Sequence, residues 1–298
     1  MTIITYPPIG HLTSVDGRQL WMDRAGVGRP AVVFAPGGGS VALDFLLVHQ
    51  RVAEMTTSVL YDRAGTGWSE NVELPRSADE VTHELRAVLR ASEVPAPYLL
   101  VGHSLGALYV QRFAQRFPAE VAGLLLLDPA HEDWDLYMHE HLKIANNQPT
   151  DTEMPELPEG FLAEYRTIFA DMFHKFPEPV RAMLIDKHLS PERLATGFRE
   201  GTNVIALFDE LRSGGPRPDV PLIILSGTAI DRSQTLFASE TQLREQIDGS
   251  QRLYDALVRA AGGEHRIVND ASHPTIPMAR PDAVSQAVAD LLERIRHL

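Results

Sequence analysis

The sequence predicts an α/β protein with a mostly parallel, doubly wound sheet and a helical cap insertion. Short apolar runs alternate along the chain with segments of helical periodicity, which is the order expected of strands joined by crossover helices. Several of these runs are apolar at every position, as in strands that helices cover on both faces. The alternation stops between about residues 131 and 218, where helical pieces follow one another.

Seven strands and three core helices are expected. Ser77 with Glu80 three residues later forms the capping-box pattern that begins one of the helices. The expected strands are Gln19–Asp23, Ala31–Ala35, Ser58–Asp62, Tyr98–Gly102, Gly123–Leu127, Pro221–Ser226 and Glu264–Val268. The expected core helices are Ser77–Ser92, Leu105–Phe117 and Pro281–Arg296.

Residues 131–218 are predicted to form a helical cap inserted into a core whose two parts are residues 1–130 and 219–298. Prolines separate the helical pieces of the cap, and Pro191 after Ser190 fits a first-turn proline behind a capping residue. The strand pattern resumes at Pro221, so we expect the chain to return to the same sheet. The predicted cap pieces are Gly160–Phe176, Pro179–His188 and Pro191–Arg212.

Composition excludes several classes of function. The chain has 27 Lys and Arg against 40 Asp and Glu, a net charge of −13, which argues against nucleic-acid binding because that affinity comes mostly from basic side chains. The absence of cysteine excludes disulfides, thiolate metal sites and a cysteine nucleophile. Residues 1–17 lack the pattern of a signal peptide, and no apolar run is long enough to span a membrane. We expect a cytoplasmic protein acting on a small-molecule substrate, of unknown oligomeric state.

A run of three glycines follows the second predicted strand. Gly37, Gly39 and Ala42 fit the dinucleotide-binding pattern G-x-G-x-x-[GA], and Asp62 lies where a ribose-binding carboxylate is expected. The oxyanion of an acyl-transfer intermediate would also need bare backbone of this kind. A phosphate-binding P-loop is excluded because no Lys-Ser/Thr pair follows the glycines.

The stretch Gly102-His103-Ser104-Leu105-Gly106 favours acyl transfer. It fits G-x-S-x-G, with an apolar strand before it and an amphipathic helix after it, which is the context that a nucleophile elbow requires. Glycines flank Ser104 because larger side chains two residues away would collide in so sharp a turn. We therefore predict that Ser104 is a nucleophile.

A serine nucleophile needs a base, and the predicted base is His273. It lies between the last predicted strand and the last predicted helix, at the sheet edge that also carries the elbow. His265 lies inside a strand and His297 near the end of the chain, so both are weaker candidates. His103 is next to the nucleophile and is expected to point into the packing.

An acid must orient the histidine, and two aspartates are candidates. Asp231 follows a predicted strand, 42 residues before His273, and is preferred. Asp128 ends the preceding strand and is the alternative. Asp270 is close in sequence to His273 but too near the strand end to orient it.

These motifs together resemble the α/β-hydrolase superfamily over nearly the whole chain, in its esterase, lipase and proline-iminopeptidase-like branch. The similar stretches are the glycine loop, "DRAGTGWS", the elbow, the cap insertion and "ASHPTIPMARPDAV". Three positions depart from the pattern of the superfamily: Pro36 replaces a usual histidine, Ala107 replaces a glycine, and Asp231 follows Gly227 by four residues instead of three.

The resemblance implies a Ser-His-Asp hydrolase that forms an acyl-enzyme on an ester, lactone or thioester and needs neither metal nor cofactor. It implies that the N–H groups of Gly38 and Leu105 stabilise the oxyanion, with Gly39 as the alternative to Gly38. Asp62 is then expected to fix the turn after its strand, with Arg63 as a partner. An acyltransferase, a cofactor-free lyase and a non-catalytic binding module are the alternatives.

Substrate choice is expected to come from the cap, whose apolar side chains favour a hydrophobic acyl or alcohol group. Trp134, Tyr137 and Phe169 are the predicted substrate-binding residues within it.

Overall fold

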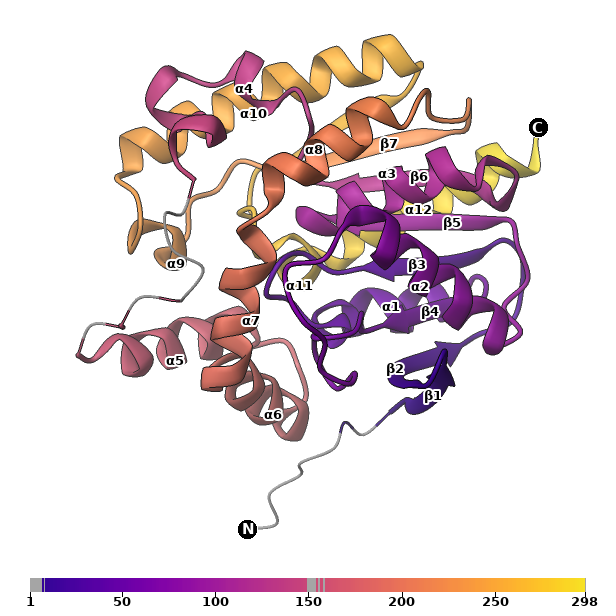
Figure 1. Cartoon of the computed structure of the whole chain (residues 1–298), viewed down its shortest axis with the longest axis horizontal. Coiled ribbons are helices and arrows are strands. Elements are labelled where there is room, and N and C mark those ends of the chain that lie inside the picture. Colours follow the sequence, from indigo (N-terminus) through magenta and orange to yellow (C-terminus); the bar gives the residue numbers. More distant parts are fainter. Residues whose placement is uncertain (1–6, 8, 149–153, 155, 158, 298) are drawn as a thin grey trace.

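An eight-stranded sheet forms the centre of the computed structural model, which describes residues 7, 9–148, 154, 156–157 and 159–297 (Figure 1). The strand order is β1-β2-β4-β3-β5-β6-β7-β8. Strand β2 runs antiparallel to its neighbours β1 and β4, and all other neighbours pair in parallel. The strands are β1 (His11–Val15), β2 (Arg18–Ala25), β3 (Ala31–Ala35), β4 (Ser58–Tyr61), β5 (Tyr98–His103), β6 (Val121–Leu127), β7 (Leu222–Gly227) and β8 (Glu264–Val268).

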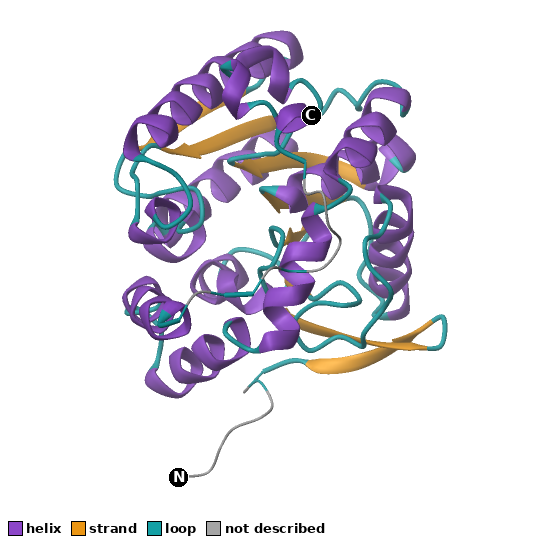
Figure 2. Cartoon of the chain, turned by 60° about the vertical axis from the view of Figure 1, so that its left-hand side comes forward, coloured by secondary structure: helices purple, strands orange, loops and turns teal. Residues whose placement is uncertain are grey.

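Helices cover both faces of this sheet (Figure 2). In β3, Val32 packs in one apolar cluster with α1 and α12, and Val33 packs in another with α2, α3 and α10. Because both faces of the strand are buried, its sequence does not alternate between apolar and polar residues. The core helices are α1 (Leu46–Ala53), α2 (Ala78–Ala91), α3 (Leu105–Arg116), α9 (Arg232–Thr235), α10 (Glu240–Ala261), α11 (Ile276–Ala279) and α12 (Pro281–Arg296).

The predicted fold class is confirmed, and each of the seven expected strands has a counterpart. Strand β1 and helix α10 are absent from the prediction. Strand β1 is mostly exposed and its sequence HLTSV is short and polar, so it carries little apolar signal. Helix α10 is long, but its buried residues Leu243, Leu253 and Val258 are diluted by charged residues and by Gly249.

Between β6 and β7 the described residues form helices and turns. Helix α8 packs against α3, while α5, α6 and α7 form a group beside the sheet instead of a layer over its face (Figure 1). We call residues 131–218 the cap. Its helices are α4 (Trp134–Tyr137), α5 (Phe161–Met172), α6 (Glu178–His188), α7 (Pro191–Gly201) and α8 (Val204–Ser213).

None of the helices in the described residues combines the length and the apolar character needed to cross a membrane.

The first residue of the cap is a buried histidine. His131 is 1% exposed, and its Nδ1 accepts a hydrogen bond from the Asp133 N–H at 3.0 Å. Burial, reinforced by the charges of Arg217 and Arg212, lowers the pKa of His131 from 6.5 to about 3. The folded protein therefore holds this side chain neutral at pH values where an unfolded chain protonates it.

This histidine makes stability depend on pH. As the pH falls below 6.5, the unfolded chain binds a proton at His131 that the folded protein does not bind. The free energy of unfolding therefore falls by about 1.4 kcal/mol per pH unit. The loss in free energy of unfolding caused by His131→Gln is therefore expected to be about 2 kcal/mol smaller at pH 5 than at pH 7. Denaturant unfolding of both proteins at the two pH values measures this difference. A cost that does not change with pH would contradict it.

Candidate active site

The candidate site lies where the central parallel strands end. Strand β5 leads into Ser104, β6 into Asp128, and β8 into the loop that carries His273. These strands run in the same direction, so their carboxyl ends share one edge of the sheet, which is where ligands bind in open α/β sheets.

Ser104 occupies a strained turn between β5 and α3. Its φ and ψ are 50° and −119°, in a region that non-glycine residues rarely adopt. A Cβ on Gly102 would lie 2.6 Å from the Ala107 Cα, and one on Gly106 would lie 2.1 Å from the Ala35 carbonyl oxygen. Both elbow glycines are therefore required for steric reasons.

His273 faces this serine. Its Nε2 lies 3.1 Å from the Ser104 Oγ, within hydrogen-bond distance, and its side chain is 42% exposed. The neighbouring His103 is buried and its Nε2 donates to the His273 carbonyl oxygen at 2.8 Å. Burial and the charge of His273 lower the pKa of His103 to about 4, so that His103 stays neutral and holds the backbone of the histidine loop.

Asp128 is the aspartate that approaches the other side of the histidine ring. Its Oδ2 lies 3.7 Å from the His273 Nδ1, and the same oxygen accepts the Gly227 N–H at 3.0 Å. Asp128 is 4% exposed and has a φ of 39°, so its backbone is held in the left-handed region directly after β6. A separation of 3.7 Å is longer than a hydrogen bond but within the range of an ion pair.

Asp231, the acid preferred from sequence spacing, has other partners. It is the N-cap of α9, where its Oδ1 accepts the N–H groups of Ser233 at 2.7 Å and Gln234 at 3.2 Å. Its Oδ2 accepts a hydrogen bond from the hydroxyl of Ser272. Asp231 therefore contacts the histidine loop one residue before His273, and the described structure shows no ion pair between these two side chains.

Among the residues that the structure describes, two further groupings of Ser, His and Asp occur. The first joins His49 Nδ1 to the Ser58 hydroxyl at 2.8 Å and Nε2 to Asp23 at 2.9 Å. The second joins the ring of His265 to the hydroxyl of Ser226 and to a carboxylate on α10, both at 2.7 Å. Ser58 and Ser226 lie within strands and are 0% exposed, so no substrate can reach them. Ser104 differs by its strained turn and its access to the sheet edge.

The glycine loop packs directly against the elbow. A Cβ on Gly37 would lie 3.3 Å from the Ser104 Cβ, and one on Gly38 would lie 3.3 Å from the Leu105 Cδ2. The N–H groups of Gly38 and Leu105 have no hydrogen-bond partner among the described residues. The Gly39 N–H donates to the Glu200 carboxylate at 2.9 Å, so the alternative oxyanion donor is already engaged.

Asp62 fixes the turn after β4, as expected. It is 0% exposed and accepts the N–H groups of Ala42 at 2.7 Å and Trp68 at 3.0 Å. Burial raises the pKa of Asp62 above its usual range, although these two hydrogen bonds oppose the shift. The carboxylate is thus unavailable to a ribose. Arg63 does not pair with it, and binds Glu200 and the glycine loop instead.

An apolar cavity of about 440 Å³ adjoins the site. It reaches the candidate site through Gly38, Gly39 and Pro274, the residue after His273. A second hollow, of about 600 Å³, lies between α3 and α10 and shares none of these residues. The aromatic residues that line the apolar cavity are Phe161, Tyr165, Phe169, Phe173, Phe198 and Phe237.

The three predicted cap residues lie in different surroundings. Phe169 lines the apolar cavity. Trp134 lines a small space of about 20 Å³ behind Asp128 and His273. Tyr137 packs on the core, and its carbonyl oxygen accepts a hydrogen bond from Arg252.

Several polar cap residues near the glycine loop are absent from the prediction. Arg193 and Glu200 are 4% exposed, and His188 in the cavity wall bonds Asp44 at 2.9 Å. The sequence carries one sign of Arg193 and Glu200: they lie one helical turn before and one turn after Gly197, a glycine inside a helix. The described residues include no group of three or more His, Asp or Glu side chains placed to hold a metal ion.

Comparison with known proteins identifies a family. A model of the family described as "Alpha/beta hydrolase family" matches residues 32–287. Among curated relatives, the Bacillus subtilis (strain 168) protein YqjL, named as uncharacterized, is 34% identical over 110 residues, which are 37% of this chain and 44% of YqjL. The chain therefore spans less than half of that relative.

Solved structures share the fold at low sequence identity. The Cfl2 protein of Burkholderia cenocepacia superposes with a TM-score of 0.68 at 19% identity, covering 94% of each chain. A thermophilic esterase from Thermogutta terrifontis superposes with a TM-score of 0.62 at 16% identity, covering 96% of this chain and 98% of the esterase. Epoxide hydrolases and a thioesterase domain have the same fold. At these identities the likeness shows the fold alone.

The strain at Ser104 can be measured by two substitutions. Ser104→Ala keeps the Cβ in the unfavourable turn, whereas Ser104→Gly removes it. Relief of about 1–3 kcal/mol of strain outweighs the entropic cost of glycine, about 0.5–1 kcal/mol. The glycine variant is therefore expected to melt about 2 °C above the alanine variant. Thermal unfolding of the pair checks this, and a more stable alanine variant would show that the turn is unstrained.

Proposed function

Because the chain belongs to the alpha/beta hydrolase family, we propose that it is a serine hydrolase that cleaves an ester, lactone or thioester bond of a small, fairly apolar substrate. One observation carries this proposal: a strained, accessible serine lies 3.1 Å from a histidine at the carboxyl edge of the sheet. The function is an acyl transfer in two steps, through an acyl-enzyme, to water.

In the first step Ser104 attacks the substrate carbonyl carbon. His273 Nε2 accepts the hydroxyl proton as the new C–O bond forms, and then gives that proton to the leaving alcohol or thiol. Water attacks the acyl-enzyme in the second step. His273 accepts a proton of the water and returns it to the Ser104 oxygen when the acid product leaves.

Asp128 is proposed as the acid of the triad. Its carboxylate faces the His273 Nδ1 and can stabilise the positive ring that each step creates. The hydrogen bond from the Gly227 N–H orients that carboxylate. Asp231 is assigned a different role, because through Ser272 it holds the loop on which His273 is placed.

The oxyanion is proposed to bind the N–H groups of Gly38 and Leu105. Leu105 is the first residue of α3, where N–H groups lack partners within the helix. Gly38 lies against it in the opposing loop. Fixed donors of this kind stabilise a transition state by roughly 3–4 kcal/mol each.

The cap is proposed to select the substrate. The cavity next to the glycine loop is lined mostly by apolar side chains, six of which come from α5 and α7, and this lining suits an apolar acyl or alcohol group. Its volume of about 440 Å³ suits a small molecule.

An acyltransferase or a cofactor-free lyase could use the same residues, and product analysis separates them from a hydrolase because they consume no water. Epoxide hydrolases share the fold. Ser104 nevertheless disfavours epoxide hydrolysis, because an aspartate nucleophile is expected at the elbow for that reaction. A non-catalytic binding module is disfavoured because all three kinds of triad residue are present.

A fluorophosphonate probe tests the nucleophile. The probe is expected to label the wild-type protein at Ser104, identified by peptide mass spectrometry. Ser104→Ala is expected to lose labelling and to lower kcat on p-nitrophenyl esters by a factor on the order of 10⁶. Esterase activity that survives this substitution would rule out the assignment.

A matched pair of variants tests the acid. Asp128→Asn is expected to lower kcat by about 10⁴, since the amide cannot balance the charge of the imidazolium. Asp231→Asn keeps an oxygen that caps α9, and is expected to lower kcat by about tenfold at most. Equal losses in the two variants would remove the basis for choosing Asp128.

A further inference from the structure

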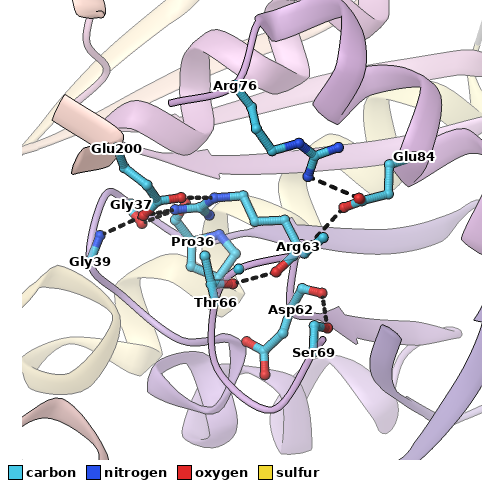
Figure 3. A network of polar contacts seen from close by, with 12 residues as sticks. Pro36, Gly37, Gly39, Asp62, Arg63, Thr66, Ser69, Arg76, Glu84 and Glu200 are labelled. Carbon is cyan, nitrogen blue, oxygen red and sulfur yellow. Dashed lines mark hydrogen bonds and ion pairs between the residues drawn. The ribbon is translucent and has the colours of Figure 1, made fainter. Parts of the chain in front are cut away.

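A buried ion pair joins the cap to the core beside the glycine loop (Figure 3). Glu200 in α7 binds Arg63, which follows β4, at 2.5 Å from Nε and 2.8 Å from Nη2. Both side chains are 3% exposed. Burial acts to lower the pKa of Arg63, but the facing Glu200 carboxylate outweighs it and raises that pKa, so Arg63 stays charged.

Both members of the pair also hold the glycine loop. Arg63 donates to the Pro36 carbonyl oxygen at 2.8 Å and to the Gly37 carbonyl oxygen at 2.7 Å. Glu200 accepts the Gly39 N–H at 2.9 Å. Gly38, the proposed oxyanion donor, therefore lies between two residues that the pair fixes.

Helix α7 also contacts the loop directly. Arg193 donates from Nε to the Gly39 carbonyl oxygen at 3.3 Å, and a Cβ on Gly197 would lie 3.0 Å from the Gly39 Cα. Positions 193, 197 and 200 are spaced by four and three residues, so they lie on one face of the helix. That face is pressed against the loop.

We propose that Glu200 is a positioning residue of the active site: through Arg63 and Gly39 it sets the place of the Gly38 N–H, so that cap helix α7 takes part in stabilising the oxyanion. This inference rests on the proposed hydrolase function. Three consecutive glycines have little conformational preference of their own, and a donor is effective only if its position is fixed before the reaction. The ion pair supplies that fixation from outside the loop.

Two variants disturb the loop in different ways. Glu200→Gln keeps the shape of the side chain but removes the charge that holds Arg63. Gly197→Ala leaves all charges in place and pushes a methyl group toward Gly39. Because alanine favours a helix more than glycine does, this second variant is not expected to destabilise α7.

Glu84→Gln is the matched control. Glu84 forms a second buried ion pair, with Arg76 at 2.9 Å, in which both side chains are 6% exposed. It accepts hydrogen bonds from Tyr61 and from the Ala64 N–H, but it makes no contact with the glycine loop among the described residues (Figure 3). Its removal reports the effect of losing a buried charge in the same region.

The readouts are kcat and KM on a p-nitrophenyl ester, the rate of fluorophosphonate inactivation, and the thermal midpoint. Glu200→Gln and Gly197→Ala are each expected to lower kcat and the inactivation rate by about tenfold or more, with KM changed less than about twofold. Glu84→Gln is expected to keep kcat while lowering the thermal midpoint. Gly197→Ala is expected to keep its thermal midpoint.

Unchanged kcat in Gly197→Ala, or equal losses in Glu200→Gln and Glu84→Gln, would overturn the inference and leave the proposed function intact. A wild-type protein that is neither labelled at Ser104 nor active on esters would overturn the proposed function, and this inference with it. If Glu200→Gln does not fold, Gly197→Ala decides alone.

Discussion

The turn at Ser104 is the constraint on which the rest of the site depends. Its N–H donates to the Leu127 carbonyl oxygen at 3.0 Å, and its carbonyl oxygen accepts the Ala130 N–H at 3.2 Å, so the elbow is tied to the end of β6 on both sides. Because Gly106 has no Cβ, α3 can approach the end of β3 at Ala35, where the glycine loop begins. One turn thereby fixes Ser104, which is the proposed nucleophile, together with the start of α3 and the loop opposite it. The strain at Ser104 costs about 1–3 kcal/mol. The turn persists because the preceding strand β5, whose six residues are all buried, holds it in place.

Hydrogen-bonded Ser, His and Asp do not by themselves define a catalytic site. The pairings around His49 and His265 are shorter than those around His273, yet their serines are inaccessible and their backbones are ordinary strand. Buried polar side chains nearly always form hydrogen bonds, so short distances between them do not indicate catalysis. The looser contacts of His273 belong to a ring that is 42% exposed and able to meet a substrate.

Local patterns made strands β2 to β8, the turn at Ser104 and the position of the loop that carries His273 predictable. A buried strand, a flanking glycine and an amphipathic helix all lie within a few residues of Ser104, so sequence spacing carries the information. The choice between Asp128 and Asp231 depends on side-chain direction and on competing partners: α9 and Ser272 engage Asp231, and spacing does not encode that. Arg63 and Glu200 are 137 residues apart, and nothing local to either indicates the other.

The pair also limits which caps this core can carry. Replacing the cap by one without an acidic side chain opposite Arg63 would leave a guanidinium buried without its counter-charge. Breaking a buried pair in this way costs about 3–5 kcal/mol, a large share of the stability of a typical domain. Cap and core of this chain are therefore not interchangeable modules, and a viable chimera has to carry Arg63 and Glu200 together or lose both at once.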